Sequence, residues 1–176
     1  MNLLFRMIWV LIRAAFGKPH APVTAPRQAR FTVWITDQDM FMHMTNSRYL
    51  SFADLGRVDL TARTGLRRAL KQQSWRAEIC GQTMTINRML KAPKSFILET
   101  QIVGWTEAYL AIAQTFLRNG KTYASVNTLL TIQDGTGAEI APKTLLELVD
   151  PAVEKPAMPK LFTDLIASTV GSSATA

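Results

Sequence analysis

The chain has 176 residues, of which 48% are hydrophobic. That length fits one domain, and the apolar fraction excludes wholesale disorder. A single cysteine, Cys80, excludes an internal disulfide, and two histidines leave few of the ligands that zinc sites use. We therefore expect neither a metal nor a cofactor, and chemistry that depends on carboxylates, hydroxyls and backbone groups.

The net charge of +7 is unevenly distributed along the chain. Residues 1–30 contain five bases and no acid, and residues 57–94 contain nine bases against two acids. Basic segments suit the phosphates of a membrane, a nucleotide or nucleic acid, although a solvated surface gives the same pattern. No nucleic-acid-binding motif accompanies the charge, so nucleic acid is not an expected partner.

Residues 3–16 (LLFRMIWVLIRAAF) predict an amphipathic helix within residues 1–17. Asn2, Arg6 and Arg13 share one helical face, and apolar side chains cover the others. The segment is too short and too charged to span a bilayer. Its pattern suits a helix in a membrane interface, or equally a helix docked on the protein body or on a partner subunit. A proline-containing linker over residues 18–29 follows.

A strand over residues 30–36 and a long helix begin the predicted main domain, residues 30–150. Thr45 or Asn46 can cap this helix, which runs to Thr64 before Gly65 ends it. Gly56 lies on the helix's apolar face, and its low helix propensity suggests a close approach to a sheet.

A short helix around residues 66–72 and four strands are expected next, in an antiparallel meander. The strands cover residues 75–89, 96–106, 109–118 and 122–133, and a short helix over residues 142–149 follows them. Asn119-Gly120 is the strongest hairpin signal, because both residues accept positive φ. One helix covers only one face of such a sheet, so a dimer joined edge to edge is expected. Residues 151–176 read as a C-terminal tail.

The segment between the first strand and the long helix carries a family signature. Asp37-Gln38-Asp39, His43-Met44-Thr45-Asn46 and Arg48-Tyr49-Leu50 resemble the pattern D-x-D-x-x-x-H-M-N-N-x-R-Y-L of hot-dog fold thioesterases, in the 4-hydroxybenzoyl-CoA thioesterase-like branch. The match continues through residues 52–57 and departs at Thr45, where the family usually has Asn. The resemblance implies an α+β hot-dog fold, in which a curved antiparallel sheet wraps around one long helix.

The resemblance also implies an acyl-CoA thioesterase that hydrolyses a thioester to a free acid and coenzyme A. It would be a cytoplasmic homodimer or homotetramer that uses no metal, with peripheral membrane contact through residues 3–16 as an option. A non-catalytic acyl-CoA or lipid-binding module at a membrane surface is the alternative. A hot-dog dehydratase fits less well, because His43 lies in the loop beside Asp39. The main domain is not expected to depend on the N-terminal helix.

Asp39 matches the family's catalytic carboxylate, acting as a general base or as a nucleophile. A loop Asp that caps a turn is the structural alternative. His43 is the second catalytic candidate, and a role in holding the loop is given equal weight. For Asp37 the structural role is favoured over the catalytic one. Asn46 and Tyr49 are candidate substrate-binding residues, although Asn46 also reads as a cap and Tyr49 lies on the buried face of its helix.

Asp54 and Arg57, three residues apart on the helix, predict an ion pair more than a catalytic pair. Arg88, Lys91 and Lys94 lie between two predicted strands. They are the candidate binding residues for the phosphates of coenzyme A, which this family usually binds at a subunit interface. A solvated turn is the competing interpretation.

Overall fold

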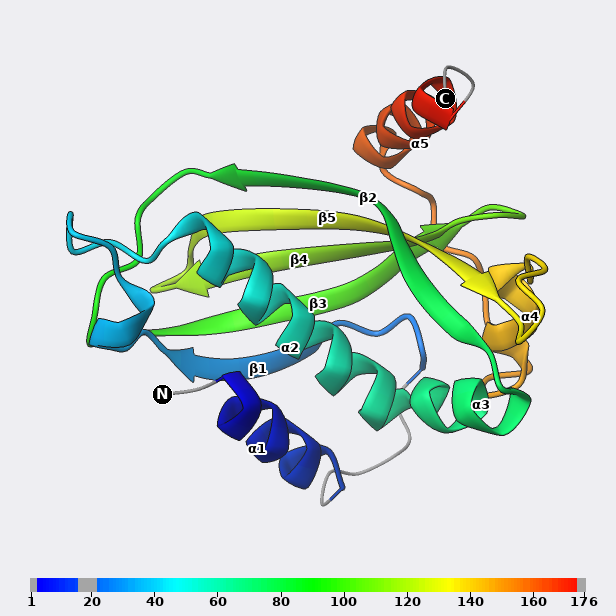
Figure 1. Ribbon diagram of the computed structural model, residues 1–176, viewed down its shortest axis with the longest axis horizontal. Coiled ribbons are helices and arrows are strands. Elements are labelled where there is room, and N and C mark those ends of the chain that lie inside the picture. The colour runs from blue at the N-terminus through cyan, green and yellow to red at the C-terminus, as the bar shows by residue number, and fades with distance from the viewer. Residues whose placement is uncertain (1–2, 16–21, 174–176) are drawn as a thin grey trace.

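A five-stranded antiparallel sheet wraps around one long helix, α2, in the computed structural model, which describes residues 3–15 and 22–173 (Figure 1). The strand order is β1-β3-β4-β5-β2. The strands are β1 (Arg27–Thr32), β2 (Arg76–Ile86), β3 (Ser95–Trp105), β4 (Leu110–Arg118) and β5 (Lys121–Gln133). This is the α+β architecture that the resemblance implies, so the predicted fold class is confirmed.

The helix α2 (Asn46–Thr64) begins and ends where the sequence predicts. Thr45 occupies the N-cap position with extended backbone, and Gly65 ends the helix in the left-handed region with φ of 84°. Gly56 faces the sheet so closely that a Cβ there would lie 2.5 Å from Thr100 Oγ1 and 2.7 Å from Gln114 Nε2. Only a residue without a side chain allows this approach, as the sequence indicates.

The strands β3, β4 and β5 form the predicted meander. Asn119 and Gly120, with φ of 50° and 69°, make the turn between β4 and β5. The expectation that β2 also belongs to the meander is wrong, because β2 pairs with β5 and not with β3. It follows α3 (Leu66–Gln73), which returns the chain to the far edge of the sheet. The two edge strands are therefore β1 and β2.

The first strand lies at Arg27–Thr32 and not over residues 30–36 as predicted. Thr32 pairs with Ser95, the first residue of β3, so the following residues have no strand to pair with. The chain leaves the sheet at Val33 and forms a short 3-10 helix, η1 (Ile35–Asp37). β1 therefore begins within the predicted linker, of which residues 18–21 lie outside the described residues.

The N-terminal helix α1 (Leu3–Ala15) packs beside α2 (Figure 1). Val10 is buried in the same hydrophobic cluster as Phe52 of α2. Arg6, which the sequence places on the cationic face of this helix, is also buried and points inward. Residues 1–2 and 16–17 of the predicted helical segment lie outside the described residues. Within the described chain, no helix combines the length and apolar character needed to cross a bilayer.

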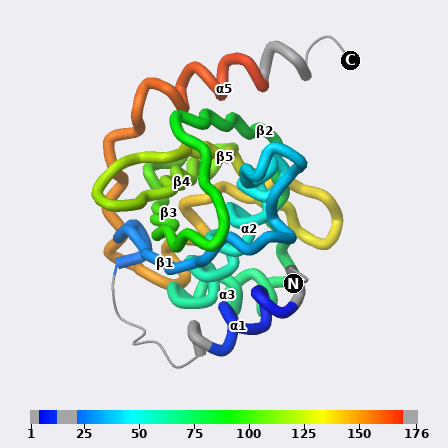
Figure 2. The backbone as a smooth tube through the Cα atoms, turned by 90° about the vertical axis from the view of Figure 1, so that its left-hand side faces the viewer, coloured from blue at the N-terminus to red at the C-terminus, as the bar shows by residue number. Residues whose placement is uncertain are grey.

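Two C-terminal helices complete the fold, α4 (Pro142–Glu147) and α5 (Lys160–Ser173). Figure 2 shows α5 and α1 on opposite sides of the sheet. Phe162 of α5 is buried against Ala111 and Leu129, on the sheet face opposite α2. The segment predicted as a tail therefore contains a packed helix. Its apolar residues Phe162, Leu165 and Ile166 follow the helical spacing that would have indicated it.

Candidate functional site

The loop that joins β1 to α2 is closed at its base by Asp37. The side chain of Asp37 is fully buried, and its Oδ2 accepts the backbone N–H of Trp34 at 2.8 Å and Arg6 Nη2 at 2.7 Å. Its backbone carbonyl accepts the N–H of Thr45 at 3.0 Å, at the start of α2. These contacts give Asp37 a structural role and fix both ends of the loop that carries Asp39.

Asp39 lies in the exposed turn of this loop. Its Oδ1 accepts the backbone N–H groups of Phe41 at 2.9 Å and His43 at 3.3 Å, and its own N–H donates to the His43 carbonyl at 2.9 Å. Met42 completes the turn with φ of 61°. Among the described residues Oδ2 accepts no hydrogen bond. One carboxylate oxygen thus holds the turn, and the other has no hydrogen-bond donor among the described residues.

The N-terminus of α2 follows this turn directly. Asn46 is the first helical residue and is exposed, so Thr45 and not Asn46 occupies the cap position. The backbone N–H groups of Asn46 and Ser47 have no acceptor within the described part of the chain. The helix dipole places partial positive charge at this end. The two amides can therefore hold a negatively charged oxygen.

His43 contributes to the loop through its backbone, which bonds Asp39 in both directions. Its imidazole is half-buried and has no hydrogen-bond partner among residues 3–15 and 22–173. The structure thus leaves the side chain of His43 available and gives the loop-holding contacts to its main chain.

Tyr49 lies in the core and not on the surface of the site, with no exposed area. Its hydroxyl accepts the backbone N–H of Leu90 at 3.0 Å, and its ring packs edge-on against Phe116. Burial raises the pKa of the phenol, against a smaller opposing effect of the Leu90 hydrogen bond. Tyr49 therefore links α2 to the loop over residues 87–94, and its role in substrate binding stays a prediction.

The 87–94 loop carries the predicted basic cluster and lies against the Asp39 loop. Met44 N–H donates to the Leu90 carbonyl at 2.8 Å, and Val33 N–H donates to the Lys94 carbonyl at 3.0 Å. Arg88, Lys91 and Lys94 all have exposed side chains. The structure thus brings the basic cluster and the Asp39 turn to the same end of the molecule (Figure 1).

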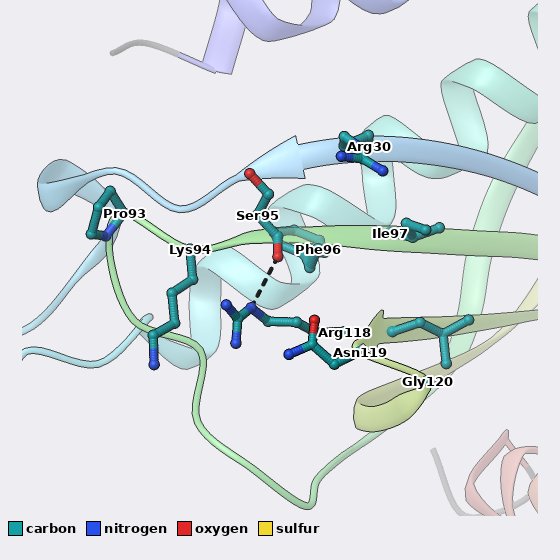
Figure 3. A pocket seen from close by; sticks show the side chains of 10 residues that line it. Arg30, Pro93, Lys94, Ser95, Phe96, Ile97, Arg118, Asn119 and Gly120 are labelled. Atoms are coloured by element: carbon teal, nitrogen blue, oxygen red, sulfur yellow. Dashed lines mark hydrogen bonds between the residues drawn. The ribbon is translucent and has the colours of Figure 1, made fainter.

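Only one of these three bases, Lys94, lines a surface hollow of about 440 Å³. Arg30 of β1 and Arg118 at the end of β4 line it as well (Figure 3). Neither arginine is among the site residues that the sequence predicts. Strand alternation could have placed Arg30 opposite the buried Ala29 and Phe31, but the approach of the β4–β5 turn to β1 is non-local.

Asp54 and Arg57 form the predicted ion pair on α2. Arg57 Nη1 also donates to Gln114 Oε1 at 3.1 Å and Thr128 Oγ1 at 3.2 Å, beneath the helix. Burial lowers the pKa of Arg57, and Asp54 opposes that shift. The contacts attach α2 to the sheet. Among the described residues, no group of His, Cys, Asp and Glu side chains is arranged to hold a metal ion.

Comparison with known proteins identifies the family of the chain and the fold it shares. A family model described as the thioesterase-like superfamily matches residues 33–163. Protein THEM6 of Danio rerio is 30% identical over 120 residues, which cover 68% of this chain and 59% of that protein. The chain thus spans less than two thirds of the length of this curated relative.

Solved structures with the same fold include a probable thioesterase from Bartonella henselae. It superposes with a TM-score of 0.60 at 16% identity, over 66% of this chain and 98% of that one. A 1,4-dihydroxy-2-naphthoyl-CoA thioesterase from Synechocystis superposes with a TM-score of 0.63 at 6% identity, over 75% and 100% of the two chains. These structures confirm the hot-dog fold that the sequence resemblance implied.

Proposed function

The chain belongs to the thioesterase-like superfamily, and from this membership we propose that it hydrolyses an acyl-CoA thioester to a free acid and coenzyme A. The observation that carries the proposal is the position of Asp39. Its carboxylate holds the turn of the loop that precedes α2 with one oxygen, and the other oxygen accepts no hydrogen bond among the described residues.

The thioester carbonyl oxygen gains negative charge when its carbon is attacked. The free N–H groups of Asn46 and Ser47 would stabilise that charge, since fixed backbone donors aimed at a developing oxyanion lower the barrier. Asn46 would thus contribute to substrate binding through its main chain. His43, beside Asp39, would contact the substrate or donate a proton to the departing thiolate.

Asp39 has two routes to the same products, and neither uses a metal. As a general base it takes a proton from water, whose oxygen attacks the carbonyl carbon before the C–S bond breaks. As a nucleophile it forms an acyl anhydride and releases the thiolate, and water then cleaves the anhydride. In both routes the thiolate leaves as coenzyme A once it is protonated. A single turnover in ¹⁸O-labelled water separates them, because only the anhydride route can place the label in Asp39.

The decisive experiment compares Asp39→Asn with the wild type on a panel of aliphatic and aromatic acyl-CoAs. Removing a base or nucleophile costs at least about 100-fold in rate. Asp164→Asn, which changes an exposed carboxylate on α5, is the matched control and should retain the wild-type rate. If wild-type protein hydrolyses none of the panel, or Asp39→Asn retains full activity, the proposed chemistry is wrong.

Arg88, Lys91 and Lys94 are proposed to bind the phosphates of coenzyme A. Their loop is bonded to the Asp39 loop through the Met44–Leu90 and Val33–Lys94 hydrogen bonds. Tyr49 would support this loop from the core by accepting the Leu90 N–H. A thioester bound at Asp39 would then extend its nucleotide towards positive charge.

A second copy of the chain is proposed as a partner. β2 is an edge strand of 11 residues with mostly exposed side chains. Long unprotected edges favour pairing with another strand, so two copies joined edge to edge would cover it. Light scattering coupled to size-exclusion chromatography should give twice or four times the 19.6 kDa chain mass.

The membrane alternative is favoured by one feature of α1. Phe5, Ile8, Trp9 and Ile12 lie at helical spacings and are all exposed, Phe5 at 65% and Trp9 at 60%. An exposed apolar helical face suits the interface of a lipid membrane. The domain would then act at a membrane, as an enzyme or as a non-catalytic acyl-CoA or lipid-binding module. The acyl-CoA panel separates these two.

A further inference from the structure

Three basic side chains from distant parts of the chain converge on one hollow at the end of the sheet. Arg30 projects from β1, Lys94 from the loop before β3, and Arg118 from the last position of β4 (Figure 3). No aspartate or glutamate lines this hollow. Among the described residues, none of the three bases forms an ion pair with a carboxylate.

The backbone around the hollow is fixed by hydrogen bonds. Arg118 Nε donates to the Ser95 carbonyl at 3.2 Å, which leaves its terminal nitrogens free to bind a ligand. The Lys94 carbonyl accepts the Val33 N–H. In the turn that follows Arg118, both Asn119 and Gly120 have left-handed backbone conformations. The hollow is therefore preformed and does not require a large rearrangement to bind a ligand.

Unneutralised like charges gathered in one place repel one another, and an anion relieves that repulsion. Arginine and lysine together provide the forked and point-charge donors that recognise phosphate oxygens. Ile97 and Leu117 supply an apolar side to the same hollow, and Asn119 supplies an amide. This combination suits a phosphate ester attached to a flat, partly apolar group such as a nucleoside.

We propose that Arg30, Lys94 and Arg118 form the pocket that receives the phosphorylated nucleotide end of the acyl-CoA. The inference rests on the proposed function and deepens it, because it adds two arginines to the phosphate-binding set. Lys94 provides the link to the reaction site through the Val33–Lys94 hydrogen bond to the Asp39 loop. Arg88 and Lys91 do not line the pocket and would contact the substrate only outside it.

The test measures each variant on two substrates with the same acyl group, one an acyl-CoA and the other an acyl-pantetheine without the nucleotide. Lys94→Gln and Arg118→Gln should each raise KM for acyl-CoA about five- to tenfold, the loss expected for one charge-assisted phosphate contact. The kcat should stay within about twofold, and acyl-pantetheine kinetics should not change. High salt should raise KM for acyl-CoA in the wild type and have less effect in the variants.

Arg67→Gln, which removes an exposed charge on α3 away from the hollow, is the control and should leave KM unchanged. Arg118→Lys should recover part of the lost affinity, because it keeps the charge without the fork. Thermal melting of each variant checks the fold, and Lys94→Gln removes no side-chain hydrogen bond. If the variants impair acyl-CoA and acyl-pantetheine equally, the pocket does not receive the nucleotide.

Calorimetric titration with coenzyme A separates failure of the pocket from failure of the proposed function. Suppose that the wild type binds coenzyme A but hydrolyses no thioester, and that Arg118→Gln no longer binds coenzyme A. The pocket assignment would then stand, and the proposed hydrolase activity would be wrong. Coenzyme A binding that is unchanged in both Lys94→Gln and Arg118→Gln would overturn the pocket. It would also be overturned if the variants bound coenzyme A normally but lost binding to phosphatidylglycerol vesicles, since the anion would then be a lipid headgroup.

Discussion

Arg6 and Asp37 form a buried ion pair across 31 residues of sequence, with Arg6 Nη2 at 2.7 Å from Asp37 Oδ2. The exposed fractions of the two side chains are 6% and 0%. The Arg6 guanidinium carbon also lies 4.7 Å from the centroid of the Phe52 ring. The N-terminal helix thus holds the loop that carries Asp39. The sequence-based expectation that the domain is independent of α1 does not allow for this contact.

Arg6→Met is expected to destabilise the protein by about 3–5 kcal/mol, because it leaves the Asp37 carboxylate buried without its closest partner. The basic side chain that remains near Asp37 is Arg48, whose Nε lies 3.5 Å from Asp37 Oδ1. Urea denaturation measures the change. Lys143→Met, which breaks an exposed pair with Glu147, is the control and should stay within about 0.5 kcal/mol of wild type. Equal effects of the two substitutions would show that the pair contributes no more than a surface contact.

Local signals in the sequence predicted most of the elements. Gly65 marked the end of α2, Asn119-Gly120 marked the β4–β5 turn, and Gly56 marked a close approach of helix and sheet. Each is a conformational requirement of one or two residues, so it can be recognised without knowledge of the fold. The motif around Asp39 was likewise contiguous in sequence.

Contacts between distant segments could not be predicted in this way. The pairing of β2 with β5, the contact of Arg6 with Asp37 and the convergence of Arg30 with Arg118 all depend on topology. Arg6 was assigned from its spacing to one helical face with Asn2 and Arg13, and that pattern left open whether the helix meets lipid or protein. Arg6 is buried because the Asp37 carboxylate, from a distant segment, neutralises its charge. The helical periodicity of residues 3–16 does not reveal that partner.

Gly56→Ala is expected to lower the free energy of unfolding by about 1–3 kcal/mol through overpacking. The new Cβ would lie 2.5 Å from Thr100 Oγ1 and 2.8 Å from Leu98 Cδ2, so the helix or the sheet must move. This cost opposes the gain of about 1 kcal/mol that Ala brings to a helix interior. Gly135→Ala, where an added Cβ meets nothing within 4 Å, is the control in chemical denaturation. A stabilised Gly56→Ala protein would contradict the close approach.

Tyr49→Phe is expected to destabilise the protein by about 1–2 kcal/mol near pH 8, because the buried Leu90 N–H loses its acceptor. The difference should narrow in the alkaline range. Burial raises the pKa of Tyr49 above its ordinary value of 10.0, so the folded protein binds this proton more tightly than the unfolded chain. That contribution is complete below pH 10 and is lost as the pH rises through the folded-state pKa.

Denaturation of wild type, Tyr49→Phe and Tyr123→Phe at several values between pH 8 and pH 11 tests this sign. Tyr123 is half-buried, and its hydroxyl makes no hydrogen bond to other described residues. A gap between wild type and Tyr49→Phe that widens with pH would mean that the phenolate is favoured in the fold, against the effect of burial.

Replacement of Phe5 and Trp9 by Ser should abolish sedimentation of the protein with anionic vesicles. Both side chains point away from α2, so the double variant leaves the buried face with Arg6 and Val10 intact. It therefore tests the outer face more cleanly than deletion of the helix, which would also remove the partner of Asp37. Binding by wild type should weaken with salt, because the basic residues near the helix would contribute about 1 kcal/mol each at an anionic surface.

Leu161→Ser on α5, another exposed apolar position, is the matched control for that experiment and should sediment as wild type does. The melting temperature of the Phe5/Trp9 variant should be unchanged, since exposed side chains add little to the core. The lipid assignment requires that wild type binds vesicles and remains one oligomeric species in their absence. If wild type ignores vesicles and the Ser substitutions change the oligomeric mass, the outer face of α1 packs against protein. The helix that Arg6 attaches to the Asp39 loop would then form a subunit contact and not a membrane contact.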